Sequence, residues 1–334
     1  MKGRTKSRMN QEITLNLDIF AEQFLNIEES LQDIFASRVP LVQDIGRHAL
    51  LKQGKRLRPL IFVLSCRLCN YGGKDIYALS TIFECIHAAS LLHDDVLDNA
   101  DIRRNRPSAN QIWGNQAAVL GGDFLFSKAL SLALGAGRIE FLKTLTSSTS
   151  KMTEGQILEL EHTDNWKLTR EQYMEIVRGK TAALISSACE CGAIISGVAS
   201  REREALAGFG LNAGTAFQLI DDLLDYTSSE EVVGKPVGKD LLEGKITLPL
   251  IYTLEGFEAG EKNRMVEHFM NGQADAEDRK KLIRAVRTGG AISRVRKEAQ
   301  GFVDEATACL RLFPDSPTKK HLLQLNGYIT KRKF

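Results

Sequence analysis

Residues 91–98 read Leu-Leu-His-Asp-Asp-Val-Leu-Asp, and residues 218–225 read Gln-Leu-Ile-Asp-Asp-Leu-Leu-Asp. Both stretches end apolar runs in which hydrophobic residues recur every three or four positions, a spacing typical of buried helices. Residues four apart on a helix share a face, so the first and last aspartates of each stretch lie one turn apart. The two aspartate repeats therefore predict two helices that face each other across one cavity.

Each repeat gathers three carboxylates among leucine and isoleucine side chains, which is a self-repulsive arrangement unless a cation lies nearby. Magnesium suits such a site because it prefers oxygen ligands and is usually held by a few carboxylates together with substrate phosphates. An acidic stripe facing solvent is the alternative, but two such stripes after apolar helical runs would be a rare coincidence. We therefore predict six metal ligands: Asp94, Asp95, Asp98, Asp221, Asp222 and Asp225.

Helical patterns extend over most of the 334 residues, without a βαβ rhythm or a hairpin pattern. The expected helices cover 11–37, 41–52, 58–71, 75–101, 109–134, 138–160, 170–198, 202–228, 246–256, 275–287, 289–311 and 317–330. The longest irregular connection runs from Ser228 to Gly244 and alternates glycines with lysines, so we interpret it as a mobile lid. We predict one all-α domain over residues 1–334, a large helical bundle around a central cavity.

The composition argues against several classes of protein. Forty-four basic residues stand against 42 acidic ones, which argues against a dedicated nucleic-acid binder. The basic N-terminus lacks an apolar segment after it, and no run approaches about 18 consecutive apolar residues, so we expect neither a signal peptide nor a membrane span. We expect a cytoplasmic protein. The Cys66-x-x-Cys69 pair lacks a second pair at metal-site spacing and is interpreted as helix-face thiols.

Basic residues that could complement a diphosphate lie near both repeats. They are Lys55, Arg58, Arg103, Arg104, Lys180, Lys235 and Lys245. Arginine binds phosphate bidentately, whereas lysine contributes a point charge. Lys180 carries the most weight, because the apolar residues after it predict burial and a buried lysine requires an anionic partner. For Arg56, Arg106 and Lys239, an ordinary surface charge is an equal alternative.

The motif Gly179-Lys180-Thr181 is not a nucleotide-binding loop, because position 174 is methionine and no strand precedes it. The motifs instead occur in the order of one known family. The chain resembles the trans-isoprenyl diphosphate synthases, also called polyprenyl synthetases, from about residue 54 to residue 249. The resemblance rests on residues 54–59, 92–98, 103–104, 155–156, 179–181, 217–225 and 234–240.

The resemblance implies an isoprenoid synthase-type bundle and a magnesium-dependent condensation of isopentenyl diphosphate with an allylic diphosphate. The allylic substrate would be geranyl, farnesyl or geranylgeranyl diphosphate, and the product a polyprenyl diphosphate for a quinone side chain. The six aspartates would hold three magnesium ions on the allylic diphosphate. The resemblance also implies a homodimer. A single departure from the pattern is Asn105, where the family usually has glycine.

The resemblance also implies a role for each remaining motif residue. Ligands of the allylic diphosphate would be Arg103, Lys180 and Lys235. Ligands of isopentenyl diphosphate would be Lys55, Arg58, His87 and Arg104. Residues that line the reaction site would be Gln156, Thr181 and Gln218, with Lys245 at the lid. Catalysis itself would fall to Lys180, Thr181, Gln218 and Arg103, and Arg332 resembles the family's C-terminal arginine.

Product length is predicted from the residues just before the first repeat. Ser90 and Ala89 lie four and five residues before Asp94, which is about 6 to 7.5 Å along a helix. In the family, a bulky aromatic residue there stops the product short, so small residues predict a product in the hexaprenyl to decaprenyl range. Candidates for the floor of the channel are Phe83, Ile86, Phe126 and Leu130. The alternative is that Ala89 and Ser90 are only tight helix-packing positions.

Several other functions remain to be weighed. A short-chain geranylgeranyl or farnesyl diphosphate synthase would carry the same motifs. A terpene cyclase shares the fold but normally has an Asn/Asp-Ser/Thr-Glu type of second metal motif. A non-catalytic partner subunit would usually have degraded repeats, and both repeats are intact here. An HD-type phosphohydrolase would need more histidines than the six present.

Overall fold

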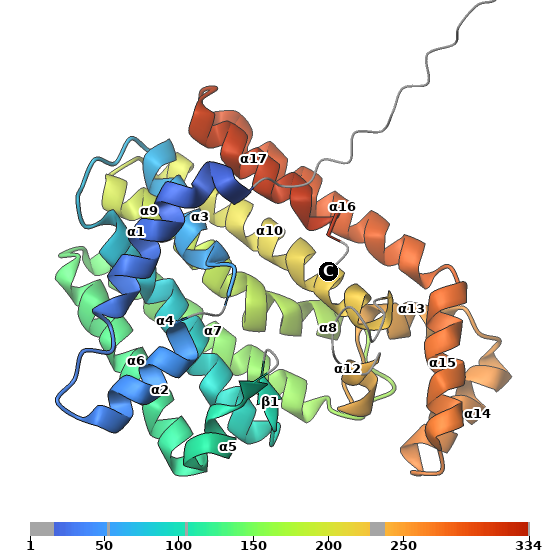
Figure 1. Cartoon of the computed structure of the whole chain (residues 1–334). Helices are drawn as coiled ribbons and strands as arrows, with labels where there is room; N and C mark the ends of the chain where they lie inside the picture. Colours follow the sequence, from blue (N-terminus) through green and yellow to red (C-terminus); the bar gives the residue numbers. More distant parts are fainter. Residues whose placement is uncertain (1–16, 52–53, 104–105, 228–237, 333–334) are drawn as a thin grey trace, which may run out of the picture.

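The computed structural model describes residues 17–51, 54–103, 106–227 and 238–332. The described chain is almost entirely helical, which confirms the predicted all-α class (Figure 1). The first half contains η1 (Leu17–Phe20), α1 (Ala21–Gln32), α2 (Pro40–Leu50), α3 (Leu57–Leu68), α4 (Ile76–Leu97), β1 (Ile102–Arg103), β2 (Arg106–Pro107), α5 (Ala109–Trp113), α6 (Asn115–Gly135) and α7 (Ile139–Glu161). The second half contains α8 (Arg170–Val177), η2 (Arg178–Ala182), α9 (Ala183–Ser196), α10 (Ser200–Thr227), α12 (Lys239–Leu242), α13 (Leu248–Glu255), α14 (Ala259–Met270), α15 (Ala276–Thr288), α16 (Ala291–Cys309), η3 (Leu310–Leu312) and α17 (Pro317–Ile329).

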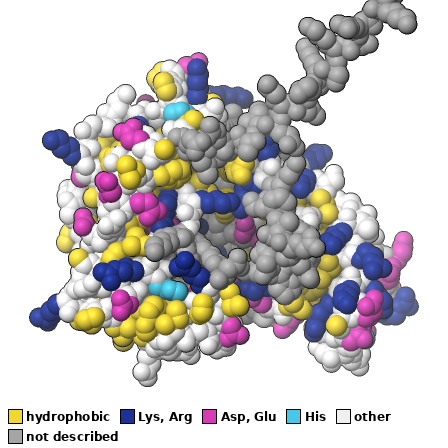
Figure 2. Space-filling view, in the orientation of Figure 1, with side chains coloured by type: hydrophobic (Ala, Val, Ile, Leu, Met, Phe, Trp, Pro, Cys, Tyr) yellow, Lys and Arg dark blue, Asp and Glu magenta, His cyan; other side chains and the backbone are white. Residues whose placement is uncertain are grey.

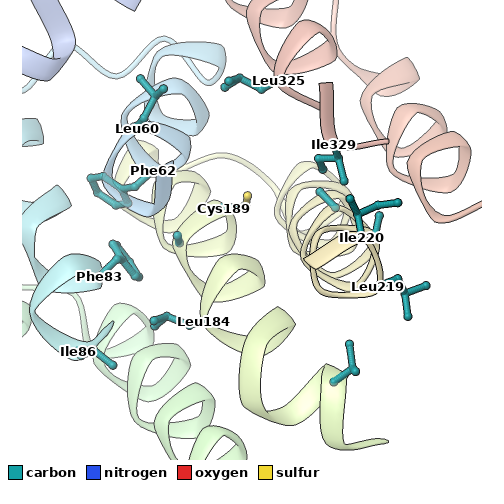
Figure 3. Packing of buried hydrophobic residues seen from close by; sticks show 14 of the residues in the cluster. Leu60, Phe62, Phe83, Ile86, Leu184, Cys189, Leu219, Ile220, Leu325 and Ile329 are labelled. Carbon is teal, nitrogen blue, oxygen red and sulfur yellow. The ribbon is translucent and has the colours of Figure 1, made fainter. Parts of the chain in front are cut away.

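The helices pack in layers around α4 and α10, which carry the two repeats. Helix α4 packs along α6, and α10 packs between α9 and α16 (Figure 1). Aromatic rings join the layers: the centroids of Phe62 on α3 and Phe83 on α4 are 5.2 Å apart, and Phe141 on α7 completes the cluster. Figure 3 shows Phe62 and Phe83 directed toward each other between these helices. The continuous apolar core fixes the distance between the repeat helices.

The structure corrects several predicted helix boundaries. The predicted helix 109–134 is broken at Gly114, whose φ of +82° favours glycine, so that α5 and α6 are separate. The predicted helix 170–198 contains a π-helical turn, η2, between α8 and α9. Helix α14 was not predicted, because it is mostly polar and buries only Val266. The antiparallel pairing of the two-residue strands β1 and β2 was not predicted either.

Helices α4 and α6 are, within the described residues, long and apolar enough to cross a membrane by length and composition alone. In α4, 67% of the apolar segment is buried inside the bundle, as expected of a core helix. In α6 only 33% is buried, so an apolar side of this helix remains exposed. Among the predicted helix-face thiols, Cys66 is buried and Cys69 is half-buried.

Candidate active site

The first repeat lies at the C-terminal end of α4, and its three aspartates have different surroundings. The carboxylate of Asp95 is buried and accepts from Arg103 Nε at 2.7 Å and Nη2 at 2.5 Å. Asp94 is half-buried; burial raises its pKa, and the positive charges of Lys180 and Arg103 oppose that shift. Asp98 ends the helix, with its Oδ2 3.8 Å from Lys245 Nζ. Asp94 and Asp98 are thus the more open carboxylates of this repeat.

The second repeat lies near the C-terminal end of α10. Its middle residue, Asp222, is buried and accepts from Tyr173 Oη at 2.5 Å and from Gln218 Nε2 at 2.6 Å. Burial raises the pKa of Asp222 to about 7, and these two hydrogen bonds oppose the rise. Asp225 accepts from the backbone N–H groups of Lys239 and Asp240 at 3.2 and 3.0 Å. The exposed carboxylate of the repeat is therefore Asp221.

The π-helical turn η2 places Lys180 and Thr181 between the two repeats. Insertions of this kind in α-helices frequently occur at functional sites. Thr181 Oγ1 donates to Gln218 Oε1 at 2.8 Å, which ties η2 to α10. Lys180 Nζ forms an ion pair with Glu159 on α7. Gly155 permits this approach, because a Cβ there would lie 2.4 Å from the backbone nitrogen of Lys180.

Glu159 and Tyr173 are site residues that the sequence interpretation missed. Besides Lys180, Glu159 Oε2 accepts a 3.4 Å hydrogen bond from Gln156 Nε2. It could have been found from its position three residues after Gln156, which puts both on one helix face. Tyr173 could have been found from its place two turns before Lys180, but an interior tyrosine on a helix is ordinarily a core residue.

A second group of cations lies beside α10, where α3 and α17 meet. Lys55, Arg58 and Arg332 line a small, largely apolar cavity with the ring of Phe217. The Arg332 guanidinium stacks 4.4 Å from the centroid of that ring and donates to Asp221 Oδ1 at 3.3 Å. Its buried Nε and Nη1 find no acceptor in the part of the chain that the structure describes. Buried donors left without acceptors indicate a site for an anion.

Burial lowers the pKa of Lys55, and the neighbouring Arg332 lowers it further. An anion bound beside Lys55 and Arg332 would offset the repulsion between these two cations, which favours anion binding at this place. His87 is half-buried on α4, two turns before Asp94. The predicted ligands Arg104 and Lys235, the departure at Asn105 and residues 228–237 of the predicted lid 228–244 lie outside the described residues. The prediction of an irregular stretch is wrong for Lys239–Leu242, which form the short helix α12.

Lys245 follows the short helix α12, and its Nζ lies 3.8 Å from Asp98 Oδ2 in the first repeat. Its Nζ lies 2.8 Å from Glu243 Oε2, and the charges of Glu159, Glu243 and Asp98 raise the pKa of Lys245 against the opposing effect of burial. The preceding Gly244 is fastened to the loop after α7, because its carbonyl accepts from Asp164 N at 2.8 Å. On the face shown in Figure 2, basic and acidic side chains gather near the centre of the molecule, beside the residues drawn in grey.

The donor set suits a metal that is shared with a substrate. Among residues 17–51, 54–103, 106–227 and 238–332, no three His, Cys, Asp or Glu side chains converge closely enough to hold a metal ion by themselves. Asp94, Asp98 and Asp221 instead present hard carboxylate oxygens from two helices. Magnesium is usually bound in this way, by one or two carboxylates plus substrate phosphates, so these residues fit it.

Comparison with known proteins gives a consistent result. Residues 39–286 match the family model for polyprenyl synthetases. The chain is 34% identical to octaprenyl diphosphate synthase from Escherichia coli, over 94% of this chain and 97% of the relative. It is 33% identical to geranylgeranyl diphosphate synthase from Methanosarcina mazei, over 86% and 89%. The structure resembles Caulobacter crescentus polyprenyl synthase in complex with calcium and isoprenyl diphosphate, with a TM-score of 0.89, 32% identity and coverage of 95% and 97%.

Proposed function

Because the chain belongs to the polyprenyl synthetase family and is therefore a trans-prenyltransferase, we propose that it makes a long-chain all-trans polyprenyl diphosphate. The substrates are isopentenyl diphosphate and an allylic diphosphate such as geranyl, farnesyl or geranylgeranyl diphosphate. One observation carries the proposal: η2 places Lys180 and Thr181 between two helices that each end in an aspartate repeat. Such a site surrounds one diphosphate with carboxylates for metal and with a cation for direct contact.

Two diphosphate substrates require two cationic groups, and the described residues offer a candidate for each. Lys180 and Arg103, beside the first repeat, suit the allylic diphosphate, with Lys235 as a predicted third ligand. Lys55, Arg58 and Arg332 suit isopentenyl diphosphate, because two buried donors of Arg332 have no acceptor among the described residues. His87 and Arg104 remain predicted ligands of the same substrate. Gln156 and Lys245 remain predicted contacts at the reaction site and the lid.

Asp94, Asp98 and Asp221 would hold magnesium. We propose three ions per site, which would supply Lewis acidity toward the leaving diphosphate. Asp95, Asp222 and Asp225 share their oxygens with protein donors, and we propose that they also position the groups around them. The different partners of the six carboxylates thus suggest a division of labour within each repeat.

The protein's own groups stabilise the charges that develop in the reaction. Lys180 exchanges Glu159 for the departing diphosphate and places positive charge where negative charge grows. The oxygens of Thr181 and Gln218 stabilise the allylic cation. The double bond of isopentenyl diphosphate then forms the new C–C bond to that cation, and the proton lost afterwards passes to an oxygen of the released diphosphate.

Product length rests on Ala89 and Ser90. Ala89 is 1% exposed, and Ser90 Oγ donates to His87 O at 2.8 Å, so both are small side chains without an unpaired polar group inside the bundle. These properties suit the wall of an apolar channel and equally suit tight packing. The octaprenyl synthase relative supports the long-chain product, whereas a geranylgeranyl or farnesyl product is the alternative.

We also propose a cytoplasmic homodimer. Large apolar side chains on α6 and α7 face solvent: Val119, Leu120, Leu134, Ile139, Ile157 and Leu160. Exposed apolar surface of this kind often marks a site of association with another protein chain. A second copy of the chain is the simplest occupant, and a non-catalytic role within a heteromer is the competing possibility.

The test is a condensation assay with labelled isopentenyl diphosphate, farnesyl diphosphate and Mg²⁺, followed by sizing of the dephosphorylated product by chromatography. We expect long-chain polyprenols, and no product after chelation of the metal. Asp94→Ala and Asp221→Ala should each lower turnover by at least about a hundredfold, since metal-assisted charge stabilisation supplies several kcal/mol. Near-normal condensation by either variant would contradict the assignment of the site.

A further inference from the structure

Arg56 lies between the proposed isopentenyl diphosphate ligands Lys55 and Arg58, but its side chain points into the protein. The residue is only 3% exposed. Its Nε donates to Glu28 Oε1 at 2.6 Å, and its Nη1 donates to Glu84 Oε1 at 2.7 Å. Its Nη2 donates to the carbonyl oxygen of Leu50. The alternative of an ordinary surface charge is therefore wrong for Arg56.

The three acceptors come from three different helices. Glu28 belongs to α1, Leu50 ends α2, and Glu84 belongs to α4, whereas Arg56 itself precedes the first turn of α3. Glu84 lies one turn before His87 and ten residues before Asp94. The guanidinium thus links the segment that carries Lys55 and Arg58 to the helix that carries the first aspartate repeat.

The contacts of the Arg56 guanidinium also maintain an unfavourable backbone conformation at this residue. Arg56 has a φ of +48°, in the left-handed region that residues with a Cβ rarely adopt. Such a conformation persists only where surrounding contacts determine it. With Arg56 turned inward, Lys55 is exposed and Arg58 is half-buried beside the cavity that Arg332 lines. The hydrogen bonds of the Arg56 guanidinium therefore determine where Lys55 and Arg58 lie.

We propose that Arg56 is a positioning residue for isopentenyl diphosphate, an inference that rests on the proposed function. Its guanidinium holds Lys55 and Arg58 at a fixed distance from the first repeat, so that the diphosphate they bind presents its double bond to the allylic cation. Only arginine can serve, because a planar fork reaches two carboxylates and a carbonyl at once, whereas a lysine is a single point charge. Small displacements of such groups are expected to weaken a site strongly.

The test compares Arg56→Lys with a matched control, Arg203→Lys. Arg203 Nε donates to Glu190 at 2.7 Å between α10 and α9, so its replacement removes a similar bond outside the proposed site. We expect Arg56→Lys to raise the KM for isopentenyl diphosphate about tenfold, roughly one lost charge-assisted hydrogen bond. The KM for farnesyl diphosphate should stay within about twofold in both variants.

A second variant separates positioning from stability. Arg56→Met combined with Glu84→Met replaces the buried ion pair by apolar side chains, which often preserves stability. We expect this variant to unfold near the wild-type temperature and still to show the raised KM for isopentenyl diphosphate. An unchanged KM in this variant and in Arg56→Lys, or an equal rise for both substrates, would overturn the positioning role. A wild-type protein that consumes no isopentenyl diphosphate would instead overturn the proposed function.

Discussion

The hydrogen bond from Tyr173 to Asp222 permits a quantitative prediction for the variant Tyr173→Phe. Both residues are buried, and the Oη–Oδ2 distance is 2.5 Å. A hydrogen bond to a charged group contributes about 1.5–3 kcal/mol, and one between neutral groups about 0.5–1.5 kcal/mol. The difference, about 1–1.5 kcal/mol, corresponds to a further rise of about one unit in the pKa of Asp222.

The sign of the pH dependence follows from the raised pKa of Asp222, about 7 in the folded protein. Between the ordinary carboxyl value and that pKa, the folded state binds more protons than the unfolded state, so stability falls as the pH rises. Tyr173→Phe removes a bond that favours the ionised form. The loss of stability should therefore be about 1 kcal/mol at pH 5.5 and about 2–2.5 kcal/mol at pH 8.5.

Urea denaturation at the two pH values, with a chelator present so that metal binding does not contribute, measures both quantities. Tyr226→Phe is the matched control, because Tyr226 is equally buried on α10 and its hydroxyl donates to no carboxylate within the described residues. Any change in the free energy of unfolding of the control should be the same at pH 5.5 and 8.5. An equally pH-independent loss for Tyr173→Phe would refute the argument that this phenol supports an ionised Asp222.

Three further predictions concern the product, the site and the oligomer. Ala89→Phe should shorten the polyprenyl product, as measured by chromatography of the dephosphorylated chains; an unchanged product length would favour simple packing at this position. Gly155→Ala should destabilise the fold by about 1–3 kcal/mol in urea titration and lower turnover, because the new Cβ would collide with the backbone of Lys180 and displace η2. Leu120→Arg, on the exposed side of α6, should convert a dimer to monomers in sedimentation experiments, while a still dimeric variant would place the interface elsewhere.

The sequence predicts most of the fold because most helices carry a clear apolar period. Helix α4 is a good example, since its hydrophobic residues recur at helical spacing up to the first repeat. Two features could not be predicted in the same way. The break at Gly114 depends on a backbone conformation that one glycine permits but does not require, and α14 contributes a single buried residue to the core. In both cases tertiary packing decides what the local pattern leaves open.

Less of the candidate site than of the fold could be predicted from the sequence. Spacing alone places Asp94 and Asp98 one turn apart, and both residues lie at the end of α4 in this relation. Spacing cannot show that Glu159, on α7, faces Lys180 on η2, because the two meet only through the close approach of Gly155. Nor can it show which way Arg56 points, since its neighbours in the sequence face the opposite direction.

The two repeats illustrate why identical spacing need not give identical chemistry. In both, the middle aspartate is rotated by about 100° from the first and turns toward the protein interior. There Asp95 meets a guanidinium, whereas Asp222 meets a phenol and an amide. Burial raises the pKa of Asp222 to about 7, although its two neutral donors oppose the rise. The charge of the second repeat in the metal-free protein should therefore vary with pH near neutrality, because Asp222 titrates there.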